Sequence, residues 1–218
     1  MLNNPGSYVG PWLNEMTPYL VEPMNELQSR DFTGLVFAGP AQCGKTDMVL
    51  NWLIYSAVCD PADMMVVQTS GPTARDFSMR RVDRLHRHSP AIGSKLAGGK
   101  QGDNTFDKHY RNGMLLTMAW PAINELSGKP IPRLWLTDYD RMPPDIDGEG
   151  AAFDLARKRA TTFRSFGMCA AESSPGFIVD NPKWVRRSAH EAPPTRGILA
   201  LYNRGDRRRW QWRCVSCH

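Results

Sequence analysis

The stretch Gly39-Pro-Ala-Gln-Cys-Gly-Lys-Thr46 decides the fold of this sequence. It fits the pattern Gly-x-x-x-x-Gly-Lys-Ser/Thr of the phosphate-binding P-loop, or Walker A motif. The apolar run Leu35–Ala38 precedes it and the apolar stretch Asp47–Cys59 follows it, which predicts a buried strand, the loop and a packed helix in that order. This order is the context that a phosphate site requires, because the positive end of the helix dipole then faces the phosphates.

The chemistry of the loop predicts what its residues do. Successive backbone N–H groups wrap the phosphate oxygens, and side chains at the glycine positions would obstruct that wrap. Lys45 should reach the β- and γ-phosphates of ATP, and the Thr46 hydroxyl should bind Mg²⁺. The candidate nucleotide-binding residues of the loop are Gly39, Pro40, Ala41, Gln42, Cys43, Gly44, Lys45 and Thr46.

A P-loop site also needs a carboxylate at the end of a nearby strand to hold Mg²⁺, and usually a second one to orient water. The apolar strand Leu134–Leu136 leads into Thr137-Asp138-Tyr139-Asp140. In one register Asp138 holds Mg²⁺ and Tyr139 stands where a glutamate is usual. In the other, Thr137 takes the metal-side place and Asp138 is the water-activating carboxylate. One of the two acids is missing in both registers, and Asp140 is the candidate that compensates.

Strand-like and helix-like segments alternate along the rest of the chain. Strands are predicted at Met64–Thr69, Met114–Trp120 and Phe166–Ala171, and helices at Val21–Gln28, Thr73–His88 and Glu149–Phe163. The glycine-containing segment Ser89–Asn112 is predicted to be a long loop. This alternation predicts an α/β fold with a mainly parallel central sheet and helices on both faces.

The last predicted strand leads into Glu172-Ser-Ser-Pro175. Small hydroxyl residues at a strand end can sense the γ-phosphate or couple hydrolysis to movement. Ser-Ser-Pro is also typical of an ordinary turn, and both interpretations stay open.

Composition limits the class of protein. The 218 residues carry a net charge of +5, which fits a polyanionic partner without requiring one. No stretch of about 18 uncharged apolar residues is present, and the N-terminus does not have the pattern of a secretory signal. We expect a cytoplasmic protein without a membrane partner. Three parts are predicted: an N-terminal arm at 1–33, a P-loop core at 34–180 and a basic C-terminal extension at 181–218.

Several short motifs stand in a particular order along the chain. They are Thr17-Pro-Tyr19, the P-loop, Gln68-Thr-Ser-Gly-Pro-Thr73, Ser127-Gly-Lys-Pro130, Leu136-Thr-Asp-Tyr-Asp-Arg-Met-Pro143, Ser173-Ser-Pro175 and Trp212-Arg-Cys-Val-Ser-Cys217. From about residue 12 to the last residue, this series resembles the lambda-type phage terminase large subunit, the packaging ATPase. The P-loop is common to many families, whereas Asp-Arg-x-Pro after the acidic strand and the late cysteine pair point to this one.

The resemblance implies a P-loop ATPase of the additional-strand type that uses ATP and Mg²⁺. It implies a motor that moves double-stranded DNA into a capsid in the bacterial host cytoplasm. The implied partners are the terminase small subunit, the portal protein and further copies of the chain in a ring. By position, the resemblance implies that Tyr19 or residues near it contact adenine, and that Ser173 and Ser174 belong to the coupling motif.

The sequence departs from the family pattern at two points. The family usually has Asp-Glu where this chain has Thr137-Asp138, which favours the second register and puts the first acid in doubt. A nuclease domain normally follows the ATPase domain, yet no cluster of carboxylates appears after residue 180. We therefore expect this chain to be the ATPase part alone, without nuclease activity.

The C-terminal extension carries two weaker signals. Cys214 and Cys217 have the spacing of zinc ligands, and a complete ribbon with Zn²⁺ would need further cysteines in a longer protein. The basic segment 204–213 mixes arginines with Trp210 and Trp212. It predicts either sequence-independent contact with a phosphate backbone or a solvated hairpin.

Two other functions compete with the packaging motor. One is a helicase or another nucleic-acid ATPase, which would separate strands; the lack of a second domain with an arginine finger counts against it. The other is an assembly module in which the missing acid leaves nucleotide binding without hydrolysis. Measuring ATP binding and phosphate release together distinguishes the two.

Overall fold

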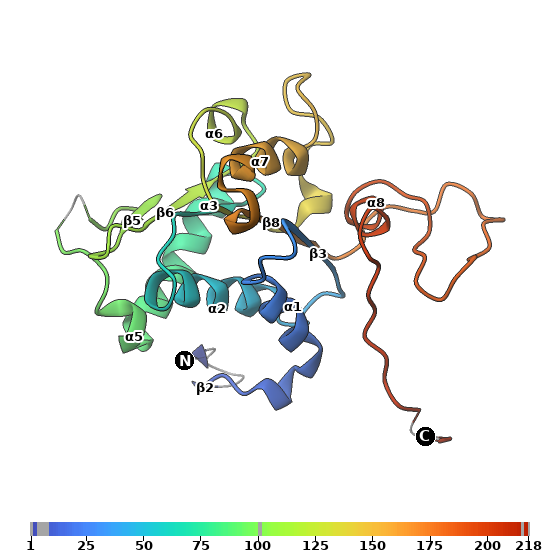
Figure 1. Cartoon of the computed structure of the whole chain (residues 1–218), viewed down its shortest axis with the longest axis horizontal. Coiled ribbons are helices and arrows are strands. Elements are labelled where there is room, and N and C mark those ends of the chain that lie inside the picture. The colour runs from blue at the N-terminus through green and yellow to red at the C-terminus, as the bar shows by residue number, and fades with distance from the viewer. Residues whose placement is uncertain (1, 4–8, 100–101, 215, 218) are drawn as a thin grey trace.

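The computed structural model describes residues 2–3, 9–99, 102–214 and 216–217, and its centre is a six-stranded sheet (Figure 1). The strand order is β3-β8-β7-β4-β6-β5, and all neighbours are parallel except the pair β5–β6. The strands are β3 (Gly34–Ala38), β4 (Met64–Val67), β5 (Asp107–His109), β6 (Leu115–Ala119), β7 (Arg133–Leu136) and β8 (Met168–Ser173). The expected mainly parallel sheet is confirmed. A separate two-stranded sheet joins β1 (Leu2–Asn3) and β2 (Val9–Gly10).

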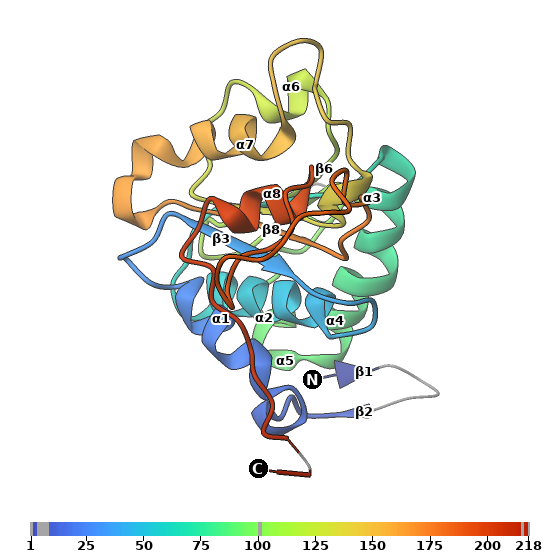
Figure 2. The same cartoon turned by 90° about the vertical axis from the view of Figure 1, so that its right-hand side faces the viewer.

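Helices cover both faces of this sheet, as Figure 2 shows. The first layer contains α1 (Val21–Glu26), α2 (Lys45–Val58), α3 (Gly71–Phe77), α4 (Asp83–His88) and α5 (Pro90–Gly93). The second contains α6 (Ile123–Leu126), α7 (Ala152–Ala160) and α8 (Ile198–Asn203). Short irregular helices are η1 (Asn14–Met16), η2 (Pro18–Leu20), η3 (Ser78–Val82), η4 (Tyr139–Arg141) and η5 (Thr161–Phe166). Every residue of β4, β7 and β8 is buried, as a parallel sheet between two helical layers requires.

Local sequence explains where several helices begin. The chain enters α2 through Gly44, which has a left-handed backbone conformation. Ser70 caps α3, because its hydroxyl accepts the Thr73 N–H and the Thr73 side chain accepts the Ser70 N–H. Further along α2, the Trp52 ring packs 5.8 Å from the ring of Trp135 on β7, which fixes the helix on the sheet.

Strand β8 lies between β3, which leads into the P-loop, and β7, which leads into the acidic segment. Ala38 pairs with Ser173, and Ala171 pairs with Leu136. This inserted strand is the arrangement that the additional-strand type predicts. The loop, the end of β8 and the end of β7 therefore meet at one edge of the sheet.

Some predicted boundaries were wrong. The segment Ser89–Asn112 contains α5 and β5, because β5 pairs with β6 and Leu96 forms a bridge with Tyr110. The helix predicted at Thr73–His88 is interrupted by the π-helical turn η3. The helix α8 was not predicted. Strand β8 starts at Met168 and continues to Ser173, because pairing with β3 extends it past Ala171.

No helix in the described part of the chain is long and apolar enough to span a bilayer. The predicted division at residues 33 and 180 stays a prediction.

Candidate functional site

Two glycines of the P-loop lie where a larger side chain would meet packed neighbours. Gly44 has φ +81°, and a Cβ there would lie 2.9 Å from Leu20 Cδ1. A Cβ on Gly39 would lie 2.7 Å from the Phe37 ring. The Gly39 N–H donates to the Ser173 carbonyl at 3.1 Å, so the loop starts in contact with the end of β8. A side chain at Gly39 or Gly44 would therefore displace a packed neighbour, and at Gly44 it would also strain the backbone.

Lys45 is the first residue of α2, and it links the loop to β8. It is 9% exposed, and its Nζ donates to the Pro40 carbonyl at 2.8 Å and to Ser174 Oγ at 3.1 Å. Glu172 Oε2 lies 4.0 Å from the same nitrogen. The structure thus brings together the P-loop lysine and the Ser-Ser segment, which are about 130 residues apart in sequence. Thr46, next along the helix, is half-buried.

Glu172 is a residue that the sequence analysis did not select. Only 3% of it is exposed; Oε1 accepts the Asp138 N–H at 3.3 Å, and Oε2 has no hydrogen-bond partner among the described residues. Burial is the main cause that raises the pKa of Glu172 to about 7; Lys45 opposes this rise and the Asp138 charge adds to it. The available signal was an acid ending the otherwise apolar run Met168–Ala171.

Asp138 stands at the carboxyl end of β7 and is exposed. Its backbone is left-handed, with φ +50°, and its N–H bond to Glu172 connects it to the Lys45 region. Thr137 is buried beside it. Both the Thr137 N–H and its hydroxyl donate to the Val67 carbonyl, at 3.0 and 3.3 Å. The two registers predicted for these residues both remain compatible with this arrangement.

Asp140 lies near the same edge, but its carboxylate binds backbone. Oδ2 accepts the Gly176 N–H at 2.8 Å and Oδ1 accepts the Ile198 N–H at 2.6 Å. The Asp140 N–H donates to Ser173 Oγ at 3.1 Å. Gly197 has φ +71°, and a Cβ there would collide with this carboxylate. Asp140 therefore joins the chain after β8 to the start of α8.

A second buried polar residue at this edge is Gln68, which the sequence places in a motif but which was not predicted to be a site residue. It directly follows β4, is 8% exposed, and its Nε2 has no partner within the described ranges. The Gln68 N–H donates to the Ala119 carbonyl at 2.9 Å, which continues the sheet. A polar residue at the end of the run Met64–Val67 was the signal in the sequence.

Tyr19 lies against the P-loop, where its hydroxyl donates to the Cys43 carbonyl at 3.1 Å. The rings of Trp210 and Trp212 lie 6.3 and 6.2 Å from the Tyr19 ring, so the C-terminal segment packs on the N-terminal one. Arg208 of the C-terminal segment also forms ion pairs with Glu22 and Glu26 on α1, at 2.8 and 2.6 Å.

The basic C-terminal segment is not a hairpin: residues 206–214 have no regular secondary structure. Several of its arginines have partners inside the molecule. Arg204 pairs with Asp154 at 2.8 Å, and Arg209 donates to the Glu191 carbonyl at 2.9 Å.

Among the residues that the structure describes, no group of three or more His, Cys, Asp or Glu could hold a metal ion. Zinc binding by Cys214 and Cys217 stays a prediction.

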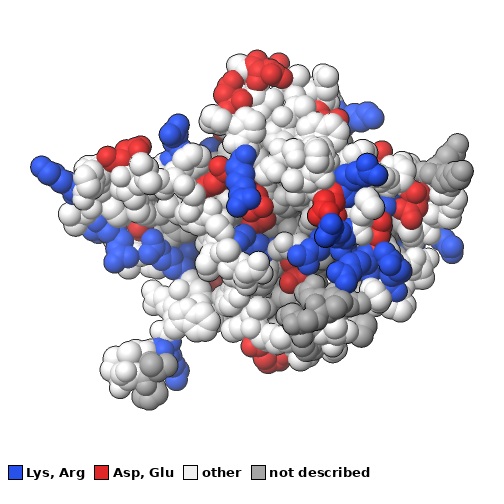
Figure 3. Space-filling model, turned by 180° about the vertical axis from the view of Figure 1, so that it is seen from behind, with Lys and Arg blue, Asp and Glu red and all other residues white. Residues whose placement is uncertain are grey.

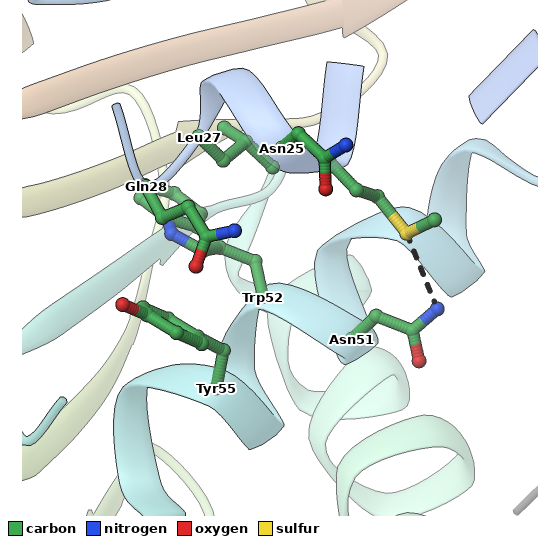
Figure 4. Close-up of a pocket in the computed structure, with 7 residues that line it drawn as sticks. Asn25, Leu27, Gln28, Asn51, Trp52 and Tyr55 are labelled. Atoms are coloured by element: carbon green, nitrogen blue, oxygen red, sulfur yellow. Dashed lines mark hydrogen bonds between the residues drawn. The ribbon is translucent and has the colours of Figure 1, made fainter. Parts of the chain in front are cut away.

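One pocket, of about 170 Å³, lies between α1 and α2 (Figure 4). Its lining residues are Met24, Asn25, Leu27, Gln28, Asn51, Trp52 and Tyr55. None of them belongs to the P-loop or to the strand ends, so this pocket is a gap between two packed helices and not the phosphate site.

Comparison with known proteins agrees with this geometry. A search of curated proteins finds no match. Among solved structures, the large terminase ATPase domain of a Thermus phage is similar, with a TM-score of 0.53 and 10% identity, over 80% of this chain and 76% of that one. At this identity the similarity concerns the fold. The family model described as "Phage terminase large subunit gpA, ATPase domain" matches residues 6–218. The chain therefore belongs to the ATPase-domain family of the phage terminase large subunit gpA.

Proposed function

We propose that this chain hydrolyses ATP with Mg²⁺ at the edge where the P-loop meets β7 and β8. The observation that carries the proposal is Lys45: it is buried at the N-terminus of α2, and its Nζ is within hydrogen-bond distance of Ser174 at the end of the inserted strand. A lysine in this place is the group that binds the β- and γ-phosphates in P-loop proteins. Ser173 and Ser174 would report phosphate occupancy to the chain that follows β8.

The residues at the edge suit Mg²⁺. Magnesium keeps several waters and binds through one or two protein ligands plus substrate phosphates, so a dedicated cluster of ligands is not needed. Thr46 offers a hydroxyl, and Asp138 offers a carboxylate for Mg²⁺ or for the attacking water. The buried, partly unpaired Glu172 carboxylate suits an edge that receives a polar ligand. Bound Mg²⁺ would neutralise charge that develops on the phosphates. Tyr19, beside the loop, would contact the adenine.

We further propose that hydrolysis drives double-stranded DNA into a capsid, in a ring of copies docked on the portal with the small subunit as partner. Family membership supports this role. A basic surface supports contact with a polyanion: Figure 3 shows Lys and Arg side chains gathered on the back of the molecule, the side that carries α3 and α4 in Figure 2. The elements η3 and α4 carry four exposed or half-exposed arginines: Arg80, Arg81, Arg84 and Arg87.

The test is a comparison of Lys45→Ala with Lys95→Ala, which changes an exposed lysine far along the chain from the loop. Phosphate release by the wild type should increase when double-stranded DNA is added. Lys45→Ala should lose about 100-fold or more of the turnover, because one charged donor to the reacting phosphate is removed. Lys95→Ala should keep it.

Unchanged turnover in Lys45→Ala would refute the site. Wild-type protein that binds ATP yet releases no phosphate would instead favour the assembly module, in which the missing acid abolishes hydrolysis.

A further inference from the structure

Three polar side chains form a row across the strand ends. Phe37 pairs with Glu172, Ala171 with Leu136, and Leu136 with Val67. Thr137 therefore lies beside Glu172, and Gln68 lies on the other side of Thr137. Successive side chains of a strand point to opposite faces of the sheet.

The preceding residue on each strand shows which face of the sheet these three side chains occupy. Ala171, Leu136 and Val67 pack into the core of the α7 layer. Their successors Glu172, Thr137 and Gln68 thus face the opposite layer, which contains α2 and the P-loop. This is the side on which Lys45 Nζ lies 4.0 Å from Glu172.

The row is polar and buried, and some of its side-chain atoms lack hydrogen-bond partners among the described residues. Within the described residues, neither Glu172 Oε2 nor Gln68 Nε2 has a hydrogen-bond partner. A buried carboxylate costs free energy unless it is paired or coordinates a metal, and the Lys45 contact of 4.0 Å is longer than a hydrogen bond. These residues lie on the side of the sheet that carries Lys45 and the P-loop.

We propose that Glu172 supplies, from β8, the magnesium-side carboxylate that β7 lacks at Thr137, and that Asp138 orients the attacking water. Glu172 lies on the strand next to Thr137, at the same register position and on the same face of the sheet. This assignment rests on the proposed ATPase function. In this assignment Thr46 and Glu172 bind the metal side of the site, Lys45 binds the phosphates and Asp138 orients the water.

Asp140 does not provide this acid. Each of its carboxylate oxygens already accepts a backbone N–H, from Gly176 and Ile198. Releasing either bond would free the chain after β8 or the start of α8. Glu172 can meet a ligand with Oε2 and keep its bond to the Asp138 N–H through Oε1.

The experiment measures binding of the ATP analogue AMP-PNP by calorimetry at increasing Mg²⁺ concentration and in EDTA. Glu172→Gln keeps the size of the side chain and an acceptor for the Asp138 N–H. It should raise the Mg²⁺ concentration needed for half-maximal binding by about 10-fold or more, as loss of one metal-supporting group does. In EDTA it should bind at least as tightly as the wild type, because a negative charge near the phosphates is gone. Glu149→Gln, at an exposed glutamate, is the matched control.

Relocating the acid gives a second readout. Thr137→Asp returns a carboxylate to β7; combined with Glu172→Gln, it should restore most of the Mg²⁺-dependent affinity. Should Glu172→Gln fail to fold, Glu172→Asp takes its place; it keeps the charge, sets the carboxylate back by one methylene and should likewise raise the Mg²⁺ concentration needed for half-maximal binding.

The outcomes separate the two proposals. Wild-type protein that does not bind AMP-PNP overturns the proposed function. Wild-type binding with an unshifted Mg²⁺ dependence in Glu172→Gln overturns this inference alone, and so does an equal loss of affinity with and without Mg²⁺. Failure of Thr137→Asp to restore Mg²⁺-dependent binding to the Glu172→Gln variant also counts against it.

Discussion

Gly44 shows how closely a single position of the P-loop is determined. Its φ of +81° is unfavourable for residues with a Cβ, and Leu20 occupies the space that a Cβ would need. We expect Gly44→Ala to lower the free energy of unfolding by about 1–2 kcal/mol and to weaken ATP binding more than this decrease explains, because the loop amides shift. Urea unfolding and calorimetry measure both quantities. Gly128→Ala, at another glycine with positive φ but with open space around it, is the control.

Asp140 should behave as a positioning residue. Asp140→Ala removes the acceptor of two backbone N–H bonds and should lower the free energy of unfolding by about 2–4 kcal/mol. Asp140→Asn retains one acceptor oxygen and should retain Mg²⁺-dependent nucleotide binding. If Asp140→Asn instead loses that binding while unfolding at the wild-type urea concentration, Asp140 is the compensating acid after all.

At the scale of elements, the C-terminal segment lies across α1 and Tyr19. Arg208 holds it through Glu22 and Glu26, and its guanidinium lies 5.1 Å from the centre of the Phe32 ring. Exposed ion pairs contribute at most about 1 kcal/mol each, so this contact governs local opening more than global stability.

Arg208→Ala should therefore speed proteolytic cleavage between residues 205 and 214 while leaving the unfolding midpoint nearly unchanged. Arg213→Ala, which alters an exposed arginine farther along the segment, should be cleaved at the wild-type rate. Equal cleavage of all three proteins would mean that the ion pairs do not hold the segment.

Tyr110, in the segment that was predicted to be a loop, is buried and pairs with the half-buried His86 of α4. His86 Nε2 lies 2.9 Å from the Tyr110 hydroxyl, near Lys108, which pairs with Asp83 at 2.8 Å and Asp103 at 2.5 Å. Burial is the main cause that lowers the pKa of His86; Lys108 lowers it further, and the two aspartates oppose this.

A lowered pKa means that the unfolded chain takes up a proton on His86 before the folded chain does. Stability should thus be complete above the unfolded pKa of about 6.5 and decline as the pH falls below it. We expect the unfolding temperature to fall less between pH 8 and pH 5.5 for His86→Gln than for the wild type. The unfolding temperature of His190→Gln, at an exposed histidine, should decrease on acidification as much as that of the wild type does.

At the scale of the whole molecule, charge is distributed unevenly. The arginines of the C-terminal segment are partly engaged with Asp154, Glu22 and Glu26, whereas the surface of α4 carries the half-exposed Arg84 and the exposed Arg87. If that surface binds the DNA backbone, Arg84→Ala with Arg87→Ala should weaken binding equally for all sequences. The slope of log affinity against log salt should fall by about 2, because each of the two arginines would neutralise one phosphate. Arg186→Ala, on a distant exposed loop, should change neither the affinity nor the slope.

The sequence by itself determined the strand–loop–helix unit, the α/β class and the candidate residues Lys45, Thr46 and Asp138, because a P-loop and its apolar flanks are local patterns. Only the tertiary structure decided which acids and amides share an edge. Glu172, Gln68 and the backbone contacts of Asp140 depend on β8 entering between β3 and β7. Parallel pairing joins residues more than a hundred positions apart, and no local periodicity encodes that partnership.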